Sequence, residues 1–285
     1  MTALTTDSDE HAVLRACQAF RWERAALHAR GEVGTERALG AGASADFYGF
    51  RAYAPGDDLR RVDWSVYART RELTLRLYRQ ETHPQLDILL DTSRSMALRD
   101  GRKPELTREL AAFAWHSARL QGSSARIFAC GEGMQWLPDV NAHFTYAPTC
   151  CLFEAPARCV QKLRPGAVRL LISDCMSEHA PERALRELAA AASRVVVLLT
   201  WGPWEAQPSL AGATELIDSE TNAAVLSTLS AATLERYQQR LARLSEGVMS
   251  ACRGVGAQCV NVVCDAALAD VLRRDLLPAW LVRPA

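Results

Sequence analysis

The stretch LDILLDTSRSM, Leu86 to Met96, joins a short apolar segment to a run of oxygen-bearing side chains. The segment LDILL has the length and composition of a strand buried in a sheet. Asp91, Ser93 and Ser95 then follow at alternate positions, so their side chains can converge within one loop. The stretch therefore predicts a buried strand that ends in a polar loop.

Beyond Leu86 the chain alternates between predicted strands and predicted helices. A largely apolar stripe from Leu106 to Leu120 follows Pro104, a residue that suits a first helical turn. CLFEAPARCVQKL predicts a helix that Pro156 kinks or starts late. Further strands are expected at ARIFACG, Met134 to Leu137, VRLLISD, RVVVLLTW and QCVNVVC, and further helices at PERALRELAAAAS, Leu234 to Val248 and ALADVLRRDLL. This order predicts an α/β domain over 85–285, with a mainly parallel sheet covered by helices on both faces.

The first 84 residues have a different texture. Ser8 or Asp9 is placed to cap a helix, and the glycine-rich RGEVGTERALGAGASADF predicts loop or extended chain. Pro55-Gly56 indicates a turn, and the alternation from Leu73 indicates a half-buried strand. We therefore expect 1–84 to form an N-terminal helix and a β-containing extension.

Composition excludes a wholly disordered chain, because 49 % of the residues are hydrophobic. Lys plus Arg equals Asp plus Glu at 33 each in 285 residues, which gives no indication of a nucleic-acid partner. No apolar run approaches the roughly 20 residues of a membrane-spanning helix. The polar start MTALTTDSDE does not resemble a signal peptide, so the expected compartment is the cytoplasm.

The nine cysteines show neither Cys-x-x-Cys spacing nor an even count. This pattern argues against a zinc knuckle, a thioredoxin-type pair and a complete set of disulfides. We expect reduced cysteines that are mostly buried.

The polar loop after Leu90 suggests a metal site. In mainly parallel sheets ligands bind beyond the carboxyl ends of the strands. Magnesium prefers six oxygen ligands at roughly 2.0–2.1 Å, so one loop is not enough. Thr149, before a predicted helix, and Asp174, after the strand VRLLIS, are expected at the same edge. The alternative is that Asp-x-Ser-x-Ser only caps a helix.

Three parts of the chain resemble known families. Asp91-Thr-Ser93-Arg-Ser95-Met96, with Thr149 and Ser173-Asp174, is similar to the metal-ion-dependent adhesion site of von Willebrand factor A domains. An upstream motif resembles that of the domain-of-unknown-function family fifty-eight, and LIDSETNAAV with Tyr237 resembles that family's tail. The upstream motif reads Arg51-Ala-Tyr53-Ala-Pro55-Gly56-Asp57-Asp58-Leu-Arg60-Arg-Val-Asp63-Trp64.

The resemblance implies a Rossmann-like von Willebrand factor A domain with Mg²⁺ (or Mn²⁺) at one edge of its sheet. By position the implied ligands are Asp91, Ser93, Ser95, Thr149 and Asp174, although Ala-Pro stands before Thr149 where the family has a glycine-rich approach. A carboxylate from a client protein would complete the metal's coordination. The implied partner is a MoxR-type AAA+ ATPase. Many family members have N-terminal membrane segments, which this chain lacks, so a soluble member is expected.

The charged run from Asp57 to Asp63 has two interpretations. It is a docking surface for the ATPase, or a turn held by ion pairs that packs Trp64 and Tyr53 onto the main domain; the second is favoured because buried pairs fix geometry. The tentative partner-binding residues are Arg51, Asp57, Asp58, Arg60 and Asp63.

Three hypotheses for function remain open. The preferred one is a non-enzymatic, metal-dependent protein-binding module. The second is a magnesium-dependent hydrolase or phosphatase with Asp91 as nucleophile, although Ser93 stands where such sites commonly have a second acid. The third is a vestigial metal site on a protein that binds through its surface alone.

Overall fold

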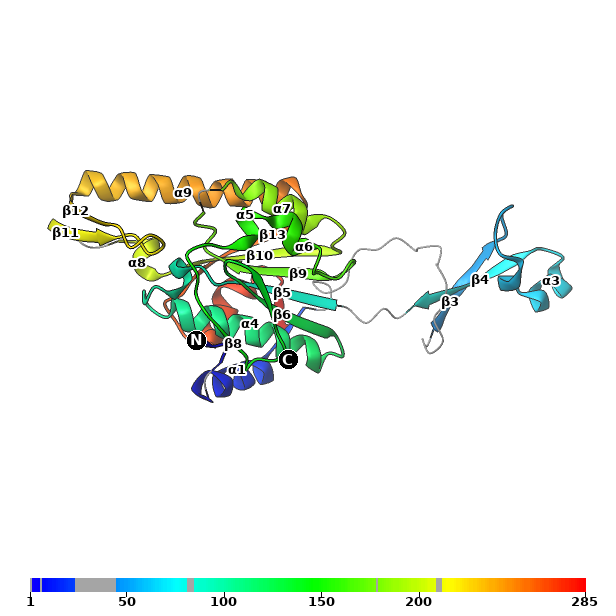
Figure 1. The fold of residues 1–285 in the computed structure, drawn as a ribbon. Coiled ribbons are helices and arrows are strands. Elements are labelled where there is room, and N and C mark those ends of the chain that lie inside the picture. The colour runs from blue at the N-terminus through cyan, green and yellow to red at the C-terminus, as the bar shows by residue number, and fades with distance from the viewer. Residues whose placement is uncertain (1, 6, 24–44, 81–84, 178, 209–211) are drawn as a thin grey trace. The chain divides into compact units, whose positions relative to one another are not determined.

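The computed structural model describes residues 2–5, 7–23, 45–80, 85–177, 179–208 and 212–285. The chain divides into two compact units, one of Met1–Gly31 with Pro84–Ala285 and one of Glu32–His83 (Figure 1). The predicted loop or extended chain at 30–47 lies outside the described residues from 30 to 44. Residues 45–47 belong to the strand β3 (Ala45–Ala52).

The larger unit is built on a six-stranded sheet with the order β13-β10-β9-β5-β6-β7. All neighbours are parallel except β6 and β7, which are antiparallel. The predicted α/β fold with a mainly parallel sheet is confirmed. In chain order the strands are β5 (Gln85–Asp91), β6 (Ser124–Cys130), β7 (Met134–Leu137), β9 (Val168–Ser173), β10 (Arg194–Trp201) and β13 (Gln258–Val263).

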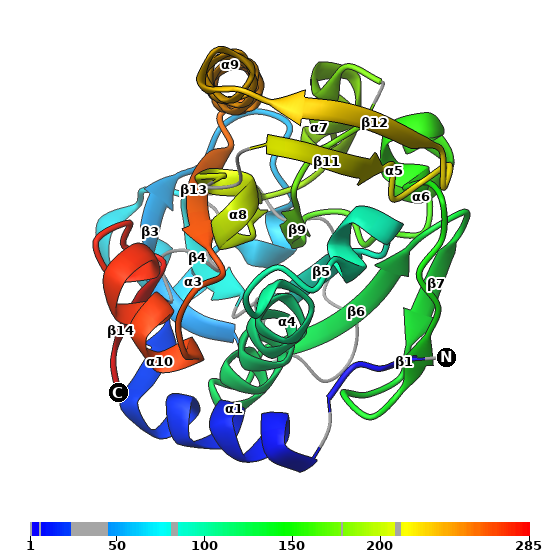
Figure 2. The same cartoon turned by 90° about the vertical axis from the view of Figure 1, so that its left-hand side faces the viewer.

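Helices cover both faces of this sheet (Figure 2). Ile88 and Leu90 of β5 join the apolar core on the side of α1, α4 and α10, while Leu89 joins the core under α5, α7 and α9. Side chains alternate between the faces of a strand, so a strand buried on both sides is apolar almost throughout. The helices are α1 (Asp7–Ala19), α4 (Lys103–Leu120), α5 (Cys151–Glu154), α6 (Pro156–Val160), α7 (Pro181–Ala189), α8 (Pro203–Ala206), α9 (Ala231–Gly254) and α10 (Leu268–Val271), which continues into the π-helix η3 (Leu272–Leu276).

Two features of the helices bear on the predictions from the sequence. α5 and α6 are separate helices because Pro156 begins the second one, as its sequence predicts. The helix α1 packs into the core of the larger unit through Val13, Ala16 and Cys17. The sequence predicts one N-terminal segment, 1–84, for this helix and the motif of residues 51–64, whereas the structure places them in different units.

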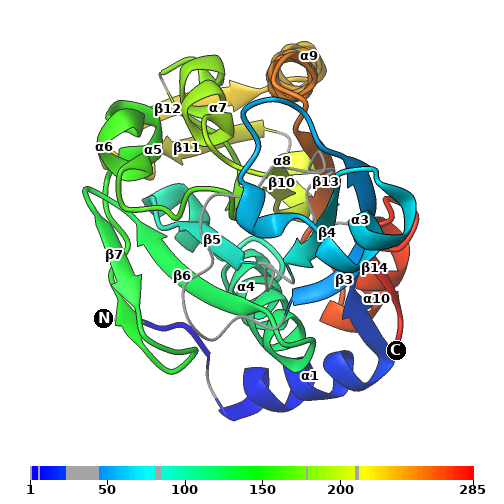
Figure 3. The ribbon, with the colours of Figure 1, turned by 90° about the vertical axis from the view of Figure 1, so that its right-hand side faces the viewer.

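Three short antiparallel pairs among the described residues were not expected from the sequence. Two of them hold the terminal segments: β1 (Thr2–Ala3) with β8 (His143–Phe144), and β2 (Phe20–Trp22) with β14 (Val282–Pro284). The third is a hairpin of β11 (Gly212–Ile217) and β12 (Ala224–Leu229) that precedes α9 (Figure 3).

The smaller unit contains the antiparallel pair β3 (Ala45–Ala52) and β4 (Thr74–Gln80), with the 3₁₀ helix η1 (Leu59–Arg61) and the helix α3 (Trp64–Thr70) between them. The predicted strand after Leu73 and the turn at Pro55-Gly56 are confirmed. Gly56 has a φ of 106°, which a side chain would disfavour.

All nine cysteines are free, and all but the half-buried Cys259 are buried, as predicted. Among the described residues, none of the helices has both the length and the apolar character that crossing a membrane requires.

Candidate metal centre

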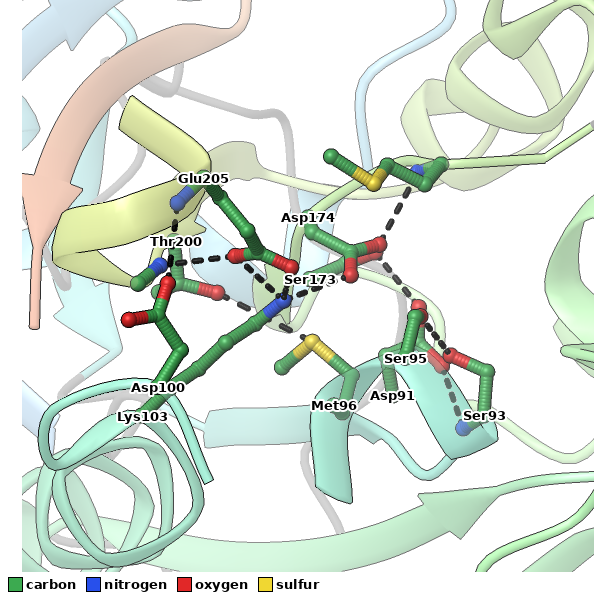
Figure 4. Close-up of polar contacts among 12 residues, drawn as sticks. Asp91, Ser93, Ser95, Met96, Asp100, Lys103, Ser173, Asp174, Thr200 and Glu205 are labelled. Atoms are coloured by element: carbon green, nitrogen blue, oxygen red, sulfur yellow. Dashed lines mark hydrogen bonds and ion pairs between the residues drawn. The ribbon is translucent and has the colours of Figure 1, made fainter. Parts of the chain in front are cut away.

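Four of the five predicted ligands, Asp91, Ser93, Ser95 and Asp174, lie at or just beyond the ends of two neighbouring strands (Figure 4). β5 and β9 run parallel, and Leu90 pairs with Ile172 in the last registered position. The next residue on each strand is Asp91 or Ser173, and Asp174 follows Ser173. Sheet pairing thus brings residues more than 80 positions apart to one edge, as expected for a mainly parallel sheet.

Both oxygens of the Asp91 carboxylate accept hydrogen bonds. The Ser173 hydroxyl donates to Oδ2 at 2.6 Å, and the backbone N–H of Ser93 donates to Oδ1 at 2.9 Å. Asp91 is only 2 % exposed. The carboxylate is therefore fixed in position within a buried pocket of polar atoms.

The two serine hydroxyls of the loop converge as the sequence predicts. Ser93 Oγ and Ser95 Oγ are 3.0 Å apart, and both side chains are buried. Ser93 precedes the 3₁₀ helix η2 (Arg94–Ala97), but its side chain makes no capping hydrogen bond there. The alternative in which the motif only caps a helix therefore does not account for the Ser93 hydroxyl.

The environment of Asp91 is unfavourable for a lone negative charge. Burial and, to a smaller extent, the nearby Asp174 carboxylate together raise the pKa of Asp91 from the ordinary 3.8 to about 6, against the hydrogen bonds from Ser173 and Ser93, which lower it. Two carboxylates in a buried site are stabilised by a cation between or beside them.

Asp174 already has a cationic partner, the buried Lys103. Lys103 Nζ donates to Asp174 Oδ2 at 2.9 Å and to both oxygens of Glu205 at 2.8 Å. The other Asp174 oxygen accepts the N–H of Met176 at 2.9 Å. Burial by itself lowers the pKa of Lys103, but the charges of Asp174 and Glu205 raise it above its ordinary value. Both Asp174 oxygens thus accept a hydrogen bond already. Asp174 would bind a metal either directly, through one of these oxygens, or through a water molecule that lies between the carboxylate and the metal.

The second loop meets the first through its backbone. Ala147 forms a parallel bridge with Ser93; its N–H donates to Thr92 O at 2.9 Å, and its carbonyl accepts from Arg94 N at 2.8 Å. A Cβ on Gly131 would lie 2.9 Å from the Ala147 side chain. The close approach is therefore permitted by a glycine at the end of β6, not by one beside Thr149.

Thr149 lies in this second loop, half-buried, two residues beyond Ala147. Its neighbour Cys150 is buried beside Asp91: burial raises the pKa of the Cys150 thiol well above its usual range, and the Asp91 charge adds to the effect. The structure thus brings the loop of Thr149 to the site, while the residue it places against Asp91 is Cys150.

The donor set fits a hard divalent cation. Among the described residues there is no cluster of three or more His, Cys, Asp or Glu side chains suited to a metal. A site at this edge would instead use the Asp91 carboxylate with the hydroxyls of Ser93 and Ser95, and oxygen ligands are those that Mg²⁺ prefers. Thr149 and Asp174 are the candidates for the remaining positions.

Four residues that contact the site were not assigned from the sequence as candidate ligands or supports. In the sequence Ser173 stands beside Asp174 with no role of its own, and Lys103 and Glu205 carry no local motif. Glu220 lies in the turn between β11 and β12, and its carboxylate accepts hydrogen bonds from the backbone N–H groups of Arg94 and Ser95. Its segment was recognised only as a family-like tail.

The tentative partner-binding residues lie in the smaller unit, apart from these loops in the sequence. Arg51 makes a two-pronged ion pair with Asp57 at 2.6 and 2.7 Å, which lowers the pKa of Asp57 to about 2. Asp58 accepts the N–H of Arg60 at 3.0 Å, and Asp63 caps α3 by accepting the N–H of Ser65 and Val66. The acidic residues of this run thus each hold a turn or a helix start. The expected packing of Trp64 and Tyr53 onto the main domain stays a prediction.

Comparisons with known proteins give a family and distant structural similarities. No curated protein matches the chain. A conserved hypothetical protein BatB from Bacteroides thetaiotaomicron is similar with a TM-score of 0.33 and 13 % identity, over 59 % of this chain and 98 % of that one. An aerotolerance-related membrane protein from Bacteroides fragilis, with multiple mutations to serine, has a TM-score of 0.31 and 12 % identity over 60 % and 98 %. The family described as "Protein of unknown function DUF58" matches residues 49–246, more than half of the chain, and the chain belongs to this family.

Proposed function

We propose that this protein is a non-enzymatic, metal-dependent protein-binding module of the von Willebrand factor A type. Asp91, Ser93 and Ser95 hold Mg²⁺ or Mn²⁺, and Thr149 and Asp174 complete the protein's share of the ligands. The cation leaves a position for an acidic side chain of a client protein.

The observation that carries the proposal is the buried Asp91 carboxylate beside two converging hydroxyls. Asp91 lies near a second acid, Asp174, and its pKa is raised to about 6. Ser93 Oγ and Ser95 Oγ, 3.0 Å apart, add neutral oxygens on the same loop. A divalent cation would offset the charge repulsion and use these oxygens together.

A thermal-unfolding titration with MgCl₂ tests the metal. Because a ligand that binds only the folded state raises its stability, we expect Mg²⁺ to raise the Tm of the chelator-treated protein. Asp91→Asn keeps the shape of the side chain and should abolish the rise. Asp139→Asn makes the same chemical change at an exposed position and should keep it. An equal Mg²⁺ response in the wild type and in Asp91→Asn would refute the site.

We propose a metal ligand, and not a nucleophile, in Asp91 because Ser93 stands where phosphoryl-transfer sites that use an aspartate commonly have a second acid. We expect no hydrolysis of p-nitrophenyl phosphate with Mg²⁺ above the rate of Asp91→Asn. A wild-type rate that the variant loses would instead favour the phosphatase hypothesis.

The proposed partner is a MoxR-type AAA+ ATPase, acting with this protein on a client in the cytoplasm. This part rests on the family resemblance of residues 51–64. Capture of the ATPase by the tagged protein, compared in Mg²⁺ and in EDTA, tests it. We call the edge of the sheet that carries Asp91, Ser93 and Ser95 the metal edge. Capture that does not depend on Mg²⁺ would place the ATPase on another surface.

A further inference from the structure

An acidic side chain of this protein, Glu220, contacts the loop of the candidate metal centre. The Glu220 carboxylate accepts the N–H of Ser95 through Oε1 at 2.9 Å, and through Oε2 at 3.3 Å it shares the N–H of Arg94 with the Ala147 carbonyl. The Arg94 guanidinium donates to the Glu220 carbonyl at 2.8 Å. Glu220 thus reaches the loop that carries the two converging hydroxyls from more than 120 residues further along the chain.

The turn that carries Glu220 is built to present it. Asp218 Oδ1 accepts the N–H of Glu220 at 3.0 Å, the N–H of Thr221 at 2.7 Å and the Thr221 hydroxyl at 2.8 Å. Asn222 adopts a left-handed φ of 59°, which asparagine tolerates better than most residues. Contacts within the turn therefore fix the backbone of Glu220, and the side chain is held by the amides of Arg94 and Ser95.

The two strands behind this turn are weakly anchored. Among the twelve residues of β11 and β12, all of them described, only Leu229 is buried. Ile217, Val225 and Leu226 are 64, 60 and 85 % exposed. Because stability from burial scales with the apolar area removed from water, little of it holds the hairpin in place.

We propose that Glu220 is an internal competitor at the metal edge, and that the client's carboxylate binds there by exchange with it. This inference rests on the proposed metal centre. The contacts of Glu220 with the amides of Arg94 and Ser95 are those that an incoming carboxylate would replace. The exposed apolar side chains Ile217 and Leu226 then lie on the element that the client must move, so a client with an acidic residue next to an apolar segment fits this surface.

The experiment uses acetate as the carboxylate probe and Mn²⁺ as the metal. Bound Mn²⁺ accelerates the proton relaxation of the acetate methyl group, which reports acetate beside the metal. Because an internal competitor reduces the fraction of open sites, its removal should lower the half-saturating acetate concentration of Glu220→Ala by about tenfold or more. Glu215→Ala removes a carboxylate from the same hairpin and should behave as the wild type.

Two further measurements separate the possible failures. Asp91→Asn should lose the relaxation effect; if the wild type shows no more Mn²⁺ binding than Asp91→Asn, the metal centre and this inference both fail. If Mn²⁺ binds normally but Glu220→Ala and wild type have the same acetate affinity, only the inference fails. Hydrogen exchange should also rise in the segments 92–96 and 212–229 of metal-free Glu220→Ala, and an unchanged exchange rate there would equally overturn the contact.

Discussion

At the scale of the residue, the electrostatics of the site depend on which of its buried acids have a cationic partner. Lys103 neutralises part of the charge of Asp174 and Glu205, whereas Asp91 receives only hydrogen bonds. Burial of an unpaired carboxylate disfavours its charged form, and this explains the direction of the Asp91 pKa shift. A bound cation would reverse that direction.

The Mg²⁺ effect should depend on pH through Asp91. In the metal-free folded state its pKa is about 6, above the ordinary 3.8, so folding takes up a proton between these values and ionised Asp91 destabilises the fold above pH 6. Mg²⁺ needs the ionised carboxylate. We expect the Mg²⁺-induced rise in Tm to be larger at pH 7.5 than at pH 5, as measured by calorimetry. An equal rise at both pH values would indicate a site that does not include Asp91.

Lys103→Met should be strongly destabilising. The lysine is fully buried, and its loss leaves two buried carboxylates without their cation, at a cost of about 3–5 kcal/mol in the free energy of unfolding. Urea denaturation measures this. In a Glu205→Gln background Lys103→Met should lower the free energy of unfolding by clearly less. An equal loss in both backgrounds would show that Lys103 stabilises the fold by packing and not through its charge.

At the scale of the element, strand β9 supports both the site and a neighbouring helix. Its last residue, Ser173, fixes Asp91, while Arg169 within the strand reaches the C-terminal end of α7. Arg169 Nη1 donates to the carbonyls of Leu188 at 2.7 Å and Ala190 at 3.0 Å. Carbonyls at the end of a helix lack partners within it, so a side chain from the sheet satisfies them.

Arg169→Met should lower the free energy of unfolding by about 2–3 kcal/mol, because buried carbonyls would lose a charged donor. Arg183→Met, on the exposed face of α7, should change it by less than about 0.5 kcal/mol. Chemical denaturation of both variants provides the comparison. If Arg169→Met lowers the free energy of unfolding as little as Arg183→Met does, water replaces the guanidinium as hydrogen-bond donor without loss of stability.

At the scale of the whole molecule, two compact units are joined in one chain, and the metal edge belongs to the larger one. The smaller unit presents an exposed aromatic residue, Trp64, which is 57 % exposed and makes an edge-to-face contact with Tyr67. Exposed aromatic side chains are frequent anchors of protein interfaces. Within its own unit Trp64 is thus a surface anchor, and both interpretations, docking of the ATPase and packing onto the main domain, stay predictions.

If Trp64 is part of the docking surface, Trp64→Ala should leave the protein folded, with a Tm close to that of the wild type, and reduce capture of the ATPase. Circular dichroism and the pull-down measure the two effects. Trp22→Ala, at a fully buried tryptophan, is the contrasting variant and should unfold or strongly destabilise the larger unit. Loss of folding in Trp64→Ala would instead support the interpretation in which the charged run packs Trp64 onto the main domain.

The sequence by itself determined the mainly parallel α/β sheet, the break at Pro156 and the loop of Asp91, Ser93 and Ser95. These features are local: strand burial, helix periodicity and alternate spacing are each written within a dozen residues. Only the tertiary structure decided which groups surround that loop. Lys103 meets Asp174 across 71 positions and Glu220 meets Ser95 across 125. The choice of such partners depends on the order of strands in the sheet and on where the β11–β12 hairpin packs, and no local pattern encodes either.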